Sequence, residues 1–288
     1  MKLDLSGGTT LITGASSGLG VEFARRFAAR GSNLVLVARR AERLEALAAE
    51  LRASANVDVE VLPADLGVAG AAIALRNELE RREIRITSLV NNAGFGSHGA
   101  FDQADPARMA GEIQLNVSAV VELSRAFMPQ LLQGRGALVM VASTAAYQPT
   151  PGMAVYGATK AFVLSFTEAL WAEARGTGLR VLAVSPGATK TEFFDVVGTD
   201  DASVGRQQTP VQVIDAAFRE LDKANGRPSI VSGRVNHITA LSTRLLSRRA
   251  LAGTSARVLG DVRLTAPQEI HSQVSASSGK ARTPGLPG

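Results

Sequence analysis

The chain has 288 residues, of which 45% are hydrophobic, and its formal net charge is +5. It contains 28 Gly and 11 Pro, which is 39 of 288 residues or about 14%, well below the roughly 25–30% typical of low-complexity disorder. The absence of cysteine excludes disulfides, thiolate metal sites and a thiol nucleophile. No apolar run reaches the roughly 18 residues that a membrane span needs, and the polar start lacks the apolar stretch of a signal peptide. These properties predict a folded, soluble protein of the cytoplasm.

The positive charge lies at the C-terminal end. Residues 1–239 carry 24 basic and 24 acidic side chains, whereas residues 240–288 carry seven basic and two acidic ones, a net charge of +5. This distribution argues against a nucleic-acid-binding face on the main part of the chain.

Short apolar runs and longer amphipathic stretches alternate along the chain. The apolar runs predict strands at residues 9–13, 33–38, 57–62, 86–90, 137–142 and 179–184, with a seventh candidate at 229–231. The amphipathic stretches predict helices at about 19–30, 41–52, 69–82, 106–132 and 156–175. Strands that alternate with helices pair in parallel and need helices on both faces, so the predicted fold class is α/β with a doubly wound parallel sheet, the Rossmann fold.

The chain divides by composition into three parts. We expect a single Rossmann domain over 1–237, a basic amphipathic extension over 238–262 and a disordered polar tail over 263–288. In the extension, an apolar stripe at helical spacing is flanked by arginines: Ile238, Leu241, Leu245 and Leu246 beside Arg244, Arg248 and Arg249. Such a helix packs on the globule or a partner subunit, caps the substrate pocket, or makes weak contact with an anionic membrane surface.

A glycine-rich loop follows the first strand and opens the first helix, with the sequence Thr13-Gly14-Ala15-Ser16-Ser17-Gly18-Leu19-Gly20. Gly14 allows a tight turn, Gly18 lets the backbone approach a phosphate, and Gly20 permits close packing of the helix. The free N–H groups at the start of the helix then face a pyrophosphate. Because the loop lacks the Gly-Lys-Ser/Thr of nucleotide triphosphatases, it predicts dinucleotide binding.

Several further motifs follow in a characteristic order: Asp65-Leu66, Asn91-Asn92-Ala93-Gly94, Asn116, Ser143, Tyr156-x-x-x-Lys160 and Pro186-Gly187-Ala188-Thr189-Lys190-Thr191. Together with the glycine loop, this order resembles the short-chain dehydrogenase/reductase family over about residues 5–235. The segment that begins at Arg227 resembles the DltE-type subgroup of uncharacterised reductases. The resemblance implies a catalytic set of Asn116, Ser143, Tyr156 and Lys160.

Chemistry supports this set. Tyr156 and Lys160 lie four residues apart on one helix face, and a nearby ammonium lowers the pKa of a phenol. Ser143 follows the fifth strand, so its hydroxyl faces the same crevice and binds the substrate oxygen. We therefore expect Tyr156 to protonate a carbonyl oxygen, or to take the proton in reverse. By resemblance, Lys160 also binds the nicotinamide ribose, and Asn116 supports a water chain to it.

The end of the second strand indicates which dinucleotide binds. An NAD site places an acidic residue there, whereas this chain has Arg39 and Arg40, whose guanidinium groups suit a phosphate; Ser16 adds a donor. NADP(H) is therefore favoured over NAD(H). By resemblance, Asp65 accepts from the adenine amino group and Thr191 contacts the nicotinamide amide or the phosphates. The predicted cofactor residues are Gly14, Ser16, Ser17, Gly18, Leu19, Gly20, Arg39, Arg40, Asp65, Leu66, Asn92, Ala93, Gly94, Tyr156, Lys160, Pro186, Gly187, Thr189 and Thr191.

The predicted substrate pocket is apolar. Its walls are Ser143, Ala145, Gln148, Pro149, Met153, Phe193 and Phe194, and residues 189–208 form a mobile lid. Such a lining favours a lipophilic carbonyl compound or secondary alcohol, although Phe193 and Phe194 could instead pack on the core. Three scattered histidines do not form a metal site.

The function expected from these residues is NADP(H)-dependent hydride transfer between the nicotinamide and a small-molecule carbonyl or alcohol, by a homodimer or homotetramer. Two alternatives stay open. One is a 3-ketoacyl thioester reductase for which the basic tail docks an acyl carrier protein. The other is a noncatalytic NADP-sensing or interaction module, because fold alone does not fix function.

Overall fold

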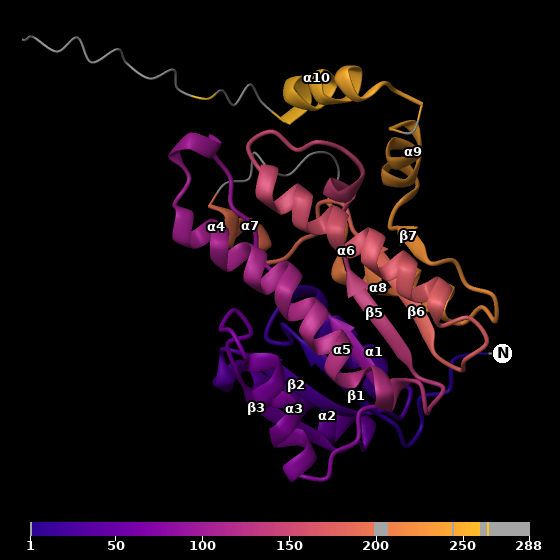
Figure 1. Ribbon diagram of the computed structural model, residues 1–288. Coiled ribbons are helices and arrows are strands. Elements are labelled where there is room, and N and C mark those ends of the chain that lie inside the picture. The colour runs from indigo at the N-terminus through magenta and orange to yellow at the C-terminus, as the bar shows by residue number, and fades with distance from the viewer. Residues whose placement is uncertain (1, 199–206, 244, 260–263, 265–288) are drawn as a thin grey trace, which may run out of the picture.

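The computed structural model describes residues 2–198, 207–243, 245–259 and 264 (Figure 1). Apart from Leu264, the tail predicted over 263–288 lies outside the described residues, as do residues 199–206 of the predicted lid. None of the described helices is long and apolar enough to cross a membrane.

The centre of the protein is a sheet of seven parallel strands in the order β3-β2-β1-β4-β5-β6-β7. The strands are β1 (Thr9–Thr13), β2 (Asn33–Ala38), β3 (Val59–Pro63), β4 (Ser88–Asn91), β5 (Ala137–Val141), β6 (Arg180–Ser185) and β7 (Ser229–Val231). The chain places β2 and β3 on one side of β1 and then crosses to β4 on the other side. Ligands of such sheets bind at the carboxyl ends of the strands beside this reversal. The predicted fold class is confirmed.

Helices cover both faces of the sheet. One face carries α1 (Gly18–Ala28), α2 (Ala41–Ala55) and α8 (Pro210–Leu221). The other carries α3 (Ala71–Arg81), α5 (Ala119–Leu131) and α6 (Ala154–Glu173). Phe27 and Phe218 are buried in the first layer, and Leu79 and Phe127 in the second. Burial of each such side chain stabilises the fold by about 1.5–3 kcal/mol, which fixes the strand ends that carry the site.

The helix predicted over 106–132 is present but irregular. It consists of α4 (Pro106–Ile113), a π-helical turn at Gln114–Ser118 and α5. A π turn inserts one extra residue into a helix, and such turns are frequent at functional sites. Asn116 lies in this turn with its side chain buried.

Two parts of the chain differ from the sequence prediction. Helix α8 was not predicted, and the expected lid contains a short helix, α7 (Phe193–Val197). The C-terminal extension forms two helices, α9 (Arg234–Ser242) and α10 (Arg248–Leu259), which extend from the end of β7 (Figure 1). Leu245 lies between them and is 89% exposed.

The extension expected over 238–262 therefore contains parts of two helices, and its apolar stripe does not lie along one of them. The break separates Ile238 and Leu241 on α9 from Arg248 and Arg249 on α10, and Arg244 lies outside the described residues. Ile238 and Leu241 are exposed, so the stripe does not pack on the globule as expected. Contact of this segment with a membrane surface stays a prediction.

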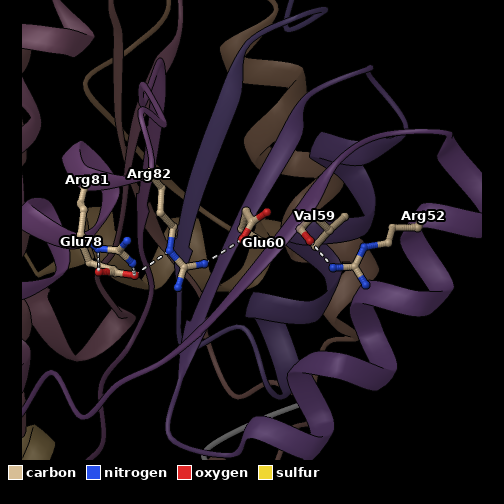
Figure 2. A network of polar contacts seen from close by, with 6 residues as sticks. All are labelled: Arg52, Val59, Glu60, Glu78, Arg81 and Arg82. Atoms are coloured by element: carbon tan, nitrogen blue, oxygen red, sulfur yellow. Dashed lines mark hydrogen bonds and ion pairs between the residues drawn. The ribbon is translucent and has the colours of Figure 1, made fainter.

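Charged side chains lie along the edge strand β3 (Figure 2). Arg82, just after α3, pairs with Glu60 on β3 at 2.9 Å and with Glu78 at 2.6 Å, and Arg52 of α2 donates to the carbonyl of Val59. Pairs this exposed add little to stability, because water screens them. Charges along an edge strand do, however, discourage pairing with another chain.

Helix α8 is fixed by an aromatic and ionic cluster. The Phe218 ring meets Phe27 edge-on at 5.1 Å between centroids, and the Arg30 guanidinium lies 4.6 Å from the Phe218 centroid. Arg30 also pairs with Asp222, which accepts from the N–H of Leu3 at 3.1 Å. The cluster therefore joins α1, α8 and the N-terminal segment.

We predict that Phe218→Ala lowers the free energy of unfolding by about 3–5 kcal/mol, because it removes a fully buried ring and leaves a cavity. Chemical denaturation followed by circular dichroism measures this loss. Val211→Ala is the matched control on the same helix: Val211 is 47% exposed, and its loss should stay within about 0.5 kcal/mol. Equal losses for both variants would show that α8 is not anchored through Phe218.

Candidate active site

A cleft of about 610 Å³ lies at the carboxyl ends of the strands. The structure brings nearly all of the predicted site residues to this one cleft. The exceptions are Gly20, Asn116 and Pro149, which do not line it. The cleft is also lined by residues that the sequence analysis did not name, among them Phe95, Gly111, Leu115, Glu192 and Val196.

The glycine loop is folded against the end of β4. The Asn92 amide donates to the carbonyls of Thr13 at 2.9 Å and Gly14 at 3.3 Å, which fixes the loop to the sheet. A Cβ at Gly20 would overlap the carbonyl oxygen of Gly14, so only glycine allows α1 to start this close to the loop. Gly20 is thus a packing residue behind the cleft.

The start of α1 is open to a ligand. Ser17 is the N-cap residue of α1, yet its side chain makes no capping hydrogen bond, and the first turn contains no acidic residue. The N–H groups of this turn therefore face the cleft together with the positive end of the helix dipole. This arrangement fits the pyrophosphate of a dinucleotide. The described residues contain no cluster of histidine, aspartate and glutamate that could hold a metal ion.

Three catalytic candidates meet in the cleft. Tyr156 and Lys160 lie on α6, the Lys160 Nζ is 5.7 Å from the centre of the Tyr156 ring, and Ser143 caps the turn after β5. Burial raises the pKa of Tyr156 to about 12, although a hydrogen bond with Ser143 opposes this rise. Burial also lowers the pKa of Lys160 to about 8. Lys160 donates to the Val141 carbonyl at 2.9 Å.

The tyrosine pKa corrects one expectation. The spacing of Tyr156 and Lys160 predicts a lowered pKa for the phenol, whereas its removal from water raises that pKa. Tyr156 is therefore a phenol at neutral pH, which is the form that donates a proton. Lys160 keeps most of its positive charge at pH 7 and loses it above pH 8.

Asn116 acts on the loop beside the cleft. Its Oδ1 accepts from the N–H of Phe95 at 3.1 Å, and its Nδ2 donates to the Phe95 carbonyl at 2.8 Å and to Thr159 Oγ1 at 3.1 Å. The amide side chain thus joins the loop after β4 to helix α6. A Cβ at Gly94 would lie 2.8 Å from Asn116 Oδ1 and 3.4 Å from Lys160 Nζ, so this corner has no room for a larger residue.

The two arginines after β2 differ in their contacts. Arg40 donates to Ser16 Oγ from Nε at 3.2 Å and from Nη2 at 3.1 Å, and it pairs with Glu192 at 2.8 Å. Arg43 pairs with the same carboxylate at 2.5 Å. Arg39 is exposed in the cleft, and we find no hydrogen bond or ion pair for it among the described residues. Arg39 is therefore the guanidinium most available to a phosphate.

Two other residues predicted by resemblance lie in the cleft with local partners. Asp65 is exposed and accepts from the N–H of Gly67 at 2.9 Å. Thr191 accepts from the N–H of Phe193 at 3.3 Å, at the start of α7. Both contacts stabilise turns and leave each side chain at the cleft wall.

The inner end of the cleft is apolar. The Phe193 ring lies 5.3 Å from Tyr156 and 5.4 Å from Phe194, centroid to centroid, and Met153 joins the same cluster. Phe193 packs in this small cluster, which is separate from the two clusters that flank the sheet. Phe193 therefore packs beside Tyr156, and its role as a substrate residue stays a prediction.

Comparison with known proteins identifies the family. The family model described as short chain dehydrogenase matches residues 8–202. The chain belongs to the short-chain dehydrogenase family. It is thus an oxidoreductase for alcohol or carbonyl groups, with a cleft that fits NAD(P).

Individual relatives agree with this assignment. Sulfoacetaldehyde reductase 2 of Chromohalobacter salexigens is 41% identical over 214 residues, which cover 72% of this chain and 84% of that protein. A short-chain dehydrogenase from Sphingobium yanoikuyae, solved in complex with NADPH, has a TM-score of 0.73 and 38% identity and covers 91% of this chain and 98% of its own. The bulky-bulky ketone specific alcohol dehydrogenase from Comamonas testosteroni has a TM-score of 0.68 and 33% identity, covering 83% and 93%.

Two features of this short-chain dehydrogenase escaped the sequence analysis. Glu192 directly follows Thr191, the last residue of the Pro186–Thr191 motif. Its ion pairs with Arg40 and Arg43 join residues about 150 positions apart, and no local sequence pattern predicts such a contact. Glu112 lies four residues before Asn116, and this spacing on one helix could have placed both at the site. The resemblance to the DltE-type subgroup stays a prediction.

We predict that Gly20→Ala lowers the affinity for NADPH at least about tenfold, a loss of roughly 1.4 kcal/mol, because the added methyl displaces the glycine loop. Fluorescence titration with NADPH measures the affinity. Gly253→Ala is the control, since a Cβ at Gly253 meets no atom within 4 Å. Unchanged affinity in Gly20→Ala would contradict the tight packing of the loop.

Proposed function

We propose that this short-chain dehydrogenase is an NADPH-dependent reductase of lipophilic carbonyl compounds that also oxidises the corresponding secondary alcohols, with Tyr156 as general acid and base. The observation that carries the proposal is the meeting of a buried phenol, a serine hydroxyl and a buried lysine in one dinucleotide-sized cleft. A protein that only senses or binds NADP needs the glycine loop but has no use for these three groups.

The reaction follows from the positions of these side chains. Ser143 donates a hydrogen bond to the carbonyl oxygen and holds it beside Tyr156, which then donates its phenolic proton to that oxygen. The nicotinamide, when bound, supplies the hydride to the carbonyl carbon. Lys160 is placed to hold the nicotinamide ribose and to stabilise the phenolate that Tyr156 becomes. In oxidation Tyr156 must first lose its proton, so a high pH favours that direction.

The preference for NADPH rests on charge. Arg39 lines the cleft after β2 without a partner among the described residues, and no acidic side chain takes the place at which an NAD site binds the ribose hydroxyls. Arg40, the next residue in the chain, donates to Ser16, and both line the same cleft. A 2′-phosphate gains charge-assisted hydrogen bonds there, which NADH cannot form.

The lipophilic substrate class rests on the inner end of the cleft, formed by Ala145, Met153, Phe193, Phe194 and Val196. Within the described part of the lining, the basic residues are Arg39, Arg40 and Lys160, and both arginines follow β2. Lys160 is assigned to the nicotinamide ribose, so an anionic aldehyde such as that of the sulfoacetaldehyde reductase would find no further basic partner near Tyr156 in the described part of the lining. The bulky ketones named for the Comamonas enzyme fit this lining better.

Two further expectations concern the partners of the protein. The 3-ketoacyl thioester alternative needs a basic docking surface, and Arg263, Lys280 and Arg282 lie outside the described residues. Assembly into a homodimer or homotetramer is supported by the exposed face of α6, where Phe162 is 39% exposed and stacks on Phe166 at 5.6 Å.

We predict that Tyr156→Phe abolishes NADPH-dependent reduction while NADPH affinity stays within about twofold, because only the proton donor is removed. A screen of NADPH oxidation over aliphatic, aromatic and steroid ketones, sulfoacetaldehyde and a ketoacyl thioester defines the assay substrate. Retained turnover in Tyr156→Phe would rule out the mechanism, and a preference for sulfoacetaldehyde would rule out the lipophilic class.

We further predict that Arg39→Asp shifts the ratio of kcat/KM for NADPH over NADH by at least about 100-fold toward NADH, or roughly 2.7 kcal/mol. The new carboxylate repels the 2′-phosphate and accepts from the ribose hydroxyls. Arg219→Asp makes the same charge change on an exposed arginine of α8 and should leave the ratio unchanged. If Arg39→Asp keeps the original ratio, Arg39 does not bind the cofactor.

A further inference from the structure

Two buried side chains of the charged residue types lack an ion pair among the described residues. The buried charged side chains are Glu112, which has no exposed surface, Lys160 at 5% and Glu220 at 6%. Glu220 pairs with Lys223 at 2.7 Å, whereas Glu112 and Lys160 form no salt bridge within the described residues. A buried charge without compensation is costly, so each of the two needs a balancing charge.

Glu112 makes one short hydrogen bond and leaves its second carboxyl oxygen without a partner among the described atoms. Its Oε2 accepts from the Ser97 hydroxyl at 2.6 Å, a distance in the range of hydroxyl bonds to charged carboxylates, about 2.5–2.7 Å. Its Oε1 is buried and has no partner among the described atoms. Arg108, one turn earlier on α4, donates to the backbone carbonyls of Gly96 and Val196 and acts on Glu112 only through its charge.

Glu112 also shapes the wall beside the catalytic tyrosine. Glu112 and Asn116 lie four residues apart on one helix and bond to Ser97 and Phe95, on either side of Gly96. A Cβ at Gly96 would lie 3.0 Å from Cδ2 of Tyr156, so this short loop packs against the ring. Glu112 itself does not line the cleft.

We propose that Glu112 is a positioning residue, a buried carboxylate that balances the charge of the Lys160 ammonium and, through Ser97, fixes the loop against Tyr156. The inference rests on the proposed function for its catalytic consequence. The groups that interact with this carboxyl group are Lys160 and Tyr156 on α6 and Arg108 on α4, through charge, and Ser97 on the loop, through its hydrogen bond.

The electrostatic consequence has a definite sign. The Glu112 charge raises the pKa of Lys160, against the lowering caused by burial, and it adds to the raised pKa of Tyr156. It therefore favours an ammonium and a neutral phenol together, which are the forms required for carbonyl reduction. Burial raises the pKa of Glu112 itself, so this support weakens in acid.

The test compares Glu112→Gln with Glu45→Gln, which removes an exposed carboxylate from α2. The chain has five lysines, so 13C-labelled lysine gives a resolved NMR titration, and the spectrum of Lys160→Arg assigns the Lys160 signal. We expect the Lys160 midpoint to fall by about one pH unit in Glu112→Gln, and to stay in place in Glu45→Gln and in the charge-conserving Glu112→Asp. The loss of NADPH-dependent reduction at alkaline pH should move down by the same amount.

An unchanged Lys160 midpoint in Glu112→Gln would overturn the proposal. If Glu112→Gln does not fold, Ser97→Ala replaces it in the test. Loss of the Ser97 hydroxyl destabilises the Glu112 carboxylate, so the Lys160 midpoint should fall as well, but by less. An unchanged Lys160 midpoint in Ser97→Ala would also overturn the proposal. The NMR titration needs no substrate. If the wild-type protein shows no NADPH-dependent reductase activity, the proposed function is refuted. The proposed role of Glu112 would still be tested by the NMR titration alone.

Discussion

Burial of ionisable groups is the constraint on which this site depends. Tyr156, Lys160 and Glu112 are all buried, and Lys160 donates to the Val141 carbonyl at the carboxyl end of β5. In such surroundings the neutral form of each group is favoured unless another charge opposes it. The protonation states needed for proton transfer thus follow from how closely α4, α6 and the loop after β4 pack together.

That packing in turn depends on the π turn. In a regular α-helix, one continuous ladder of hydrogen bonds would run from Pro106 to Leu131. The extra residue at Gln114–Ser118 interrupts this ladder where Asn116 bonds to Phe95 and Thr159. The irregular turn therefore supplies the link between the loop after β4 and the catalytic helix, at a cost in regular hydrogen bonding that the side chain of Asn116 offsets.

The sequence predicted most of the fold because local signals and tertiary structure agree there. Strands β1, β2 and β7 fall where the apolar runs are bounded by polar or glycine residues. Helix α8 could also have been predicted from the sequence. Its start, Thr209-Pro210-Val211-Gln212, is a capping box with proline at the first helical position. The apolar stripe of the C-terminal extension did not predict the break between α9 and α10, because helical spacing of apolar residues does not show where a helix ends.

The sequence predicted which residues line the cleft, but it did not predict their pKa values. Motif order brought Ser143, Tyr156 and Lys160 to one cleft, since parallel strands end at one edge. Spacing on a helix shows which groups are neighbours, but the pKa of Tyr156 depends on how much water reaches it, and that is set by Phe193, Met153 and the 95–97 loop together.

The same reasoning explains why the two ends of the cleft behave differently. At the adenosine end, Arg40, Arg43 and Glu192 are between 41% and 50% exposed, so their contacts are weakened by water and salt and can be exchanged for those of a phosphate. At the nicotinamide end, the charges are buried and fixed before any ligand arrives. Under the proposed function, such a site binds its cofactor through adaptable surface charges and carries out proton transfer with preorganised buried ones.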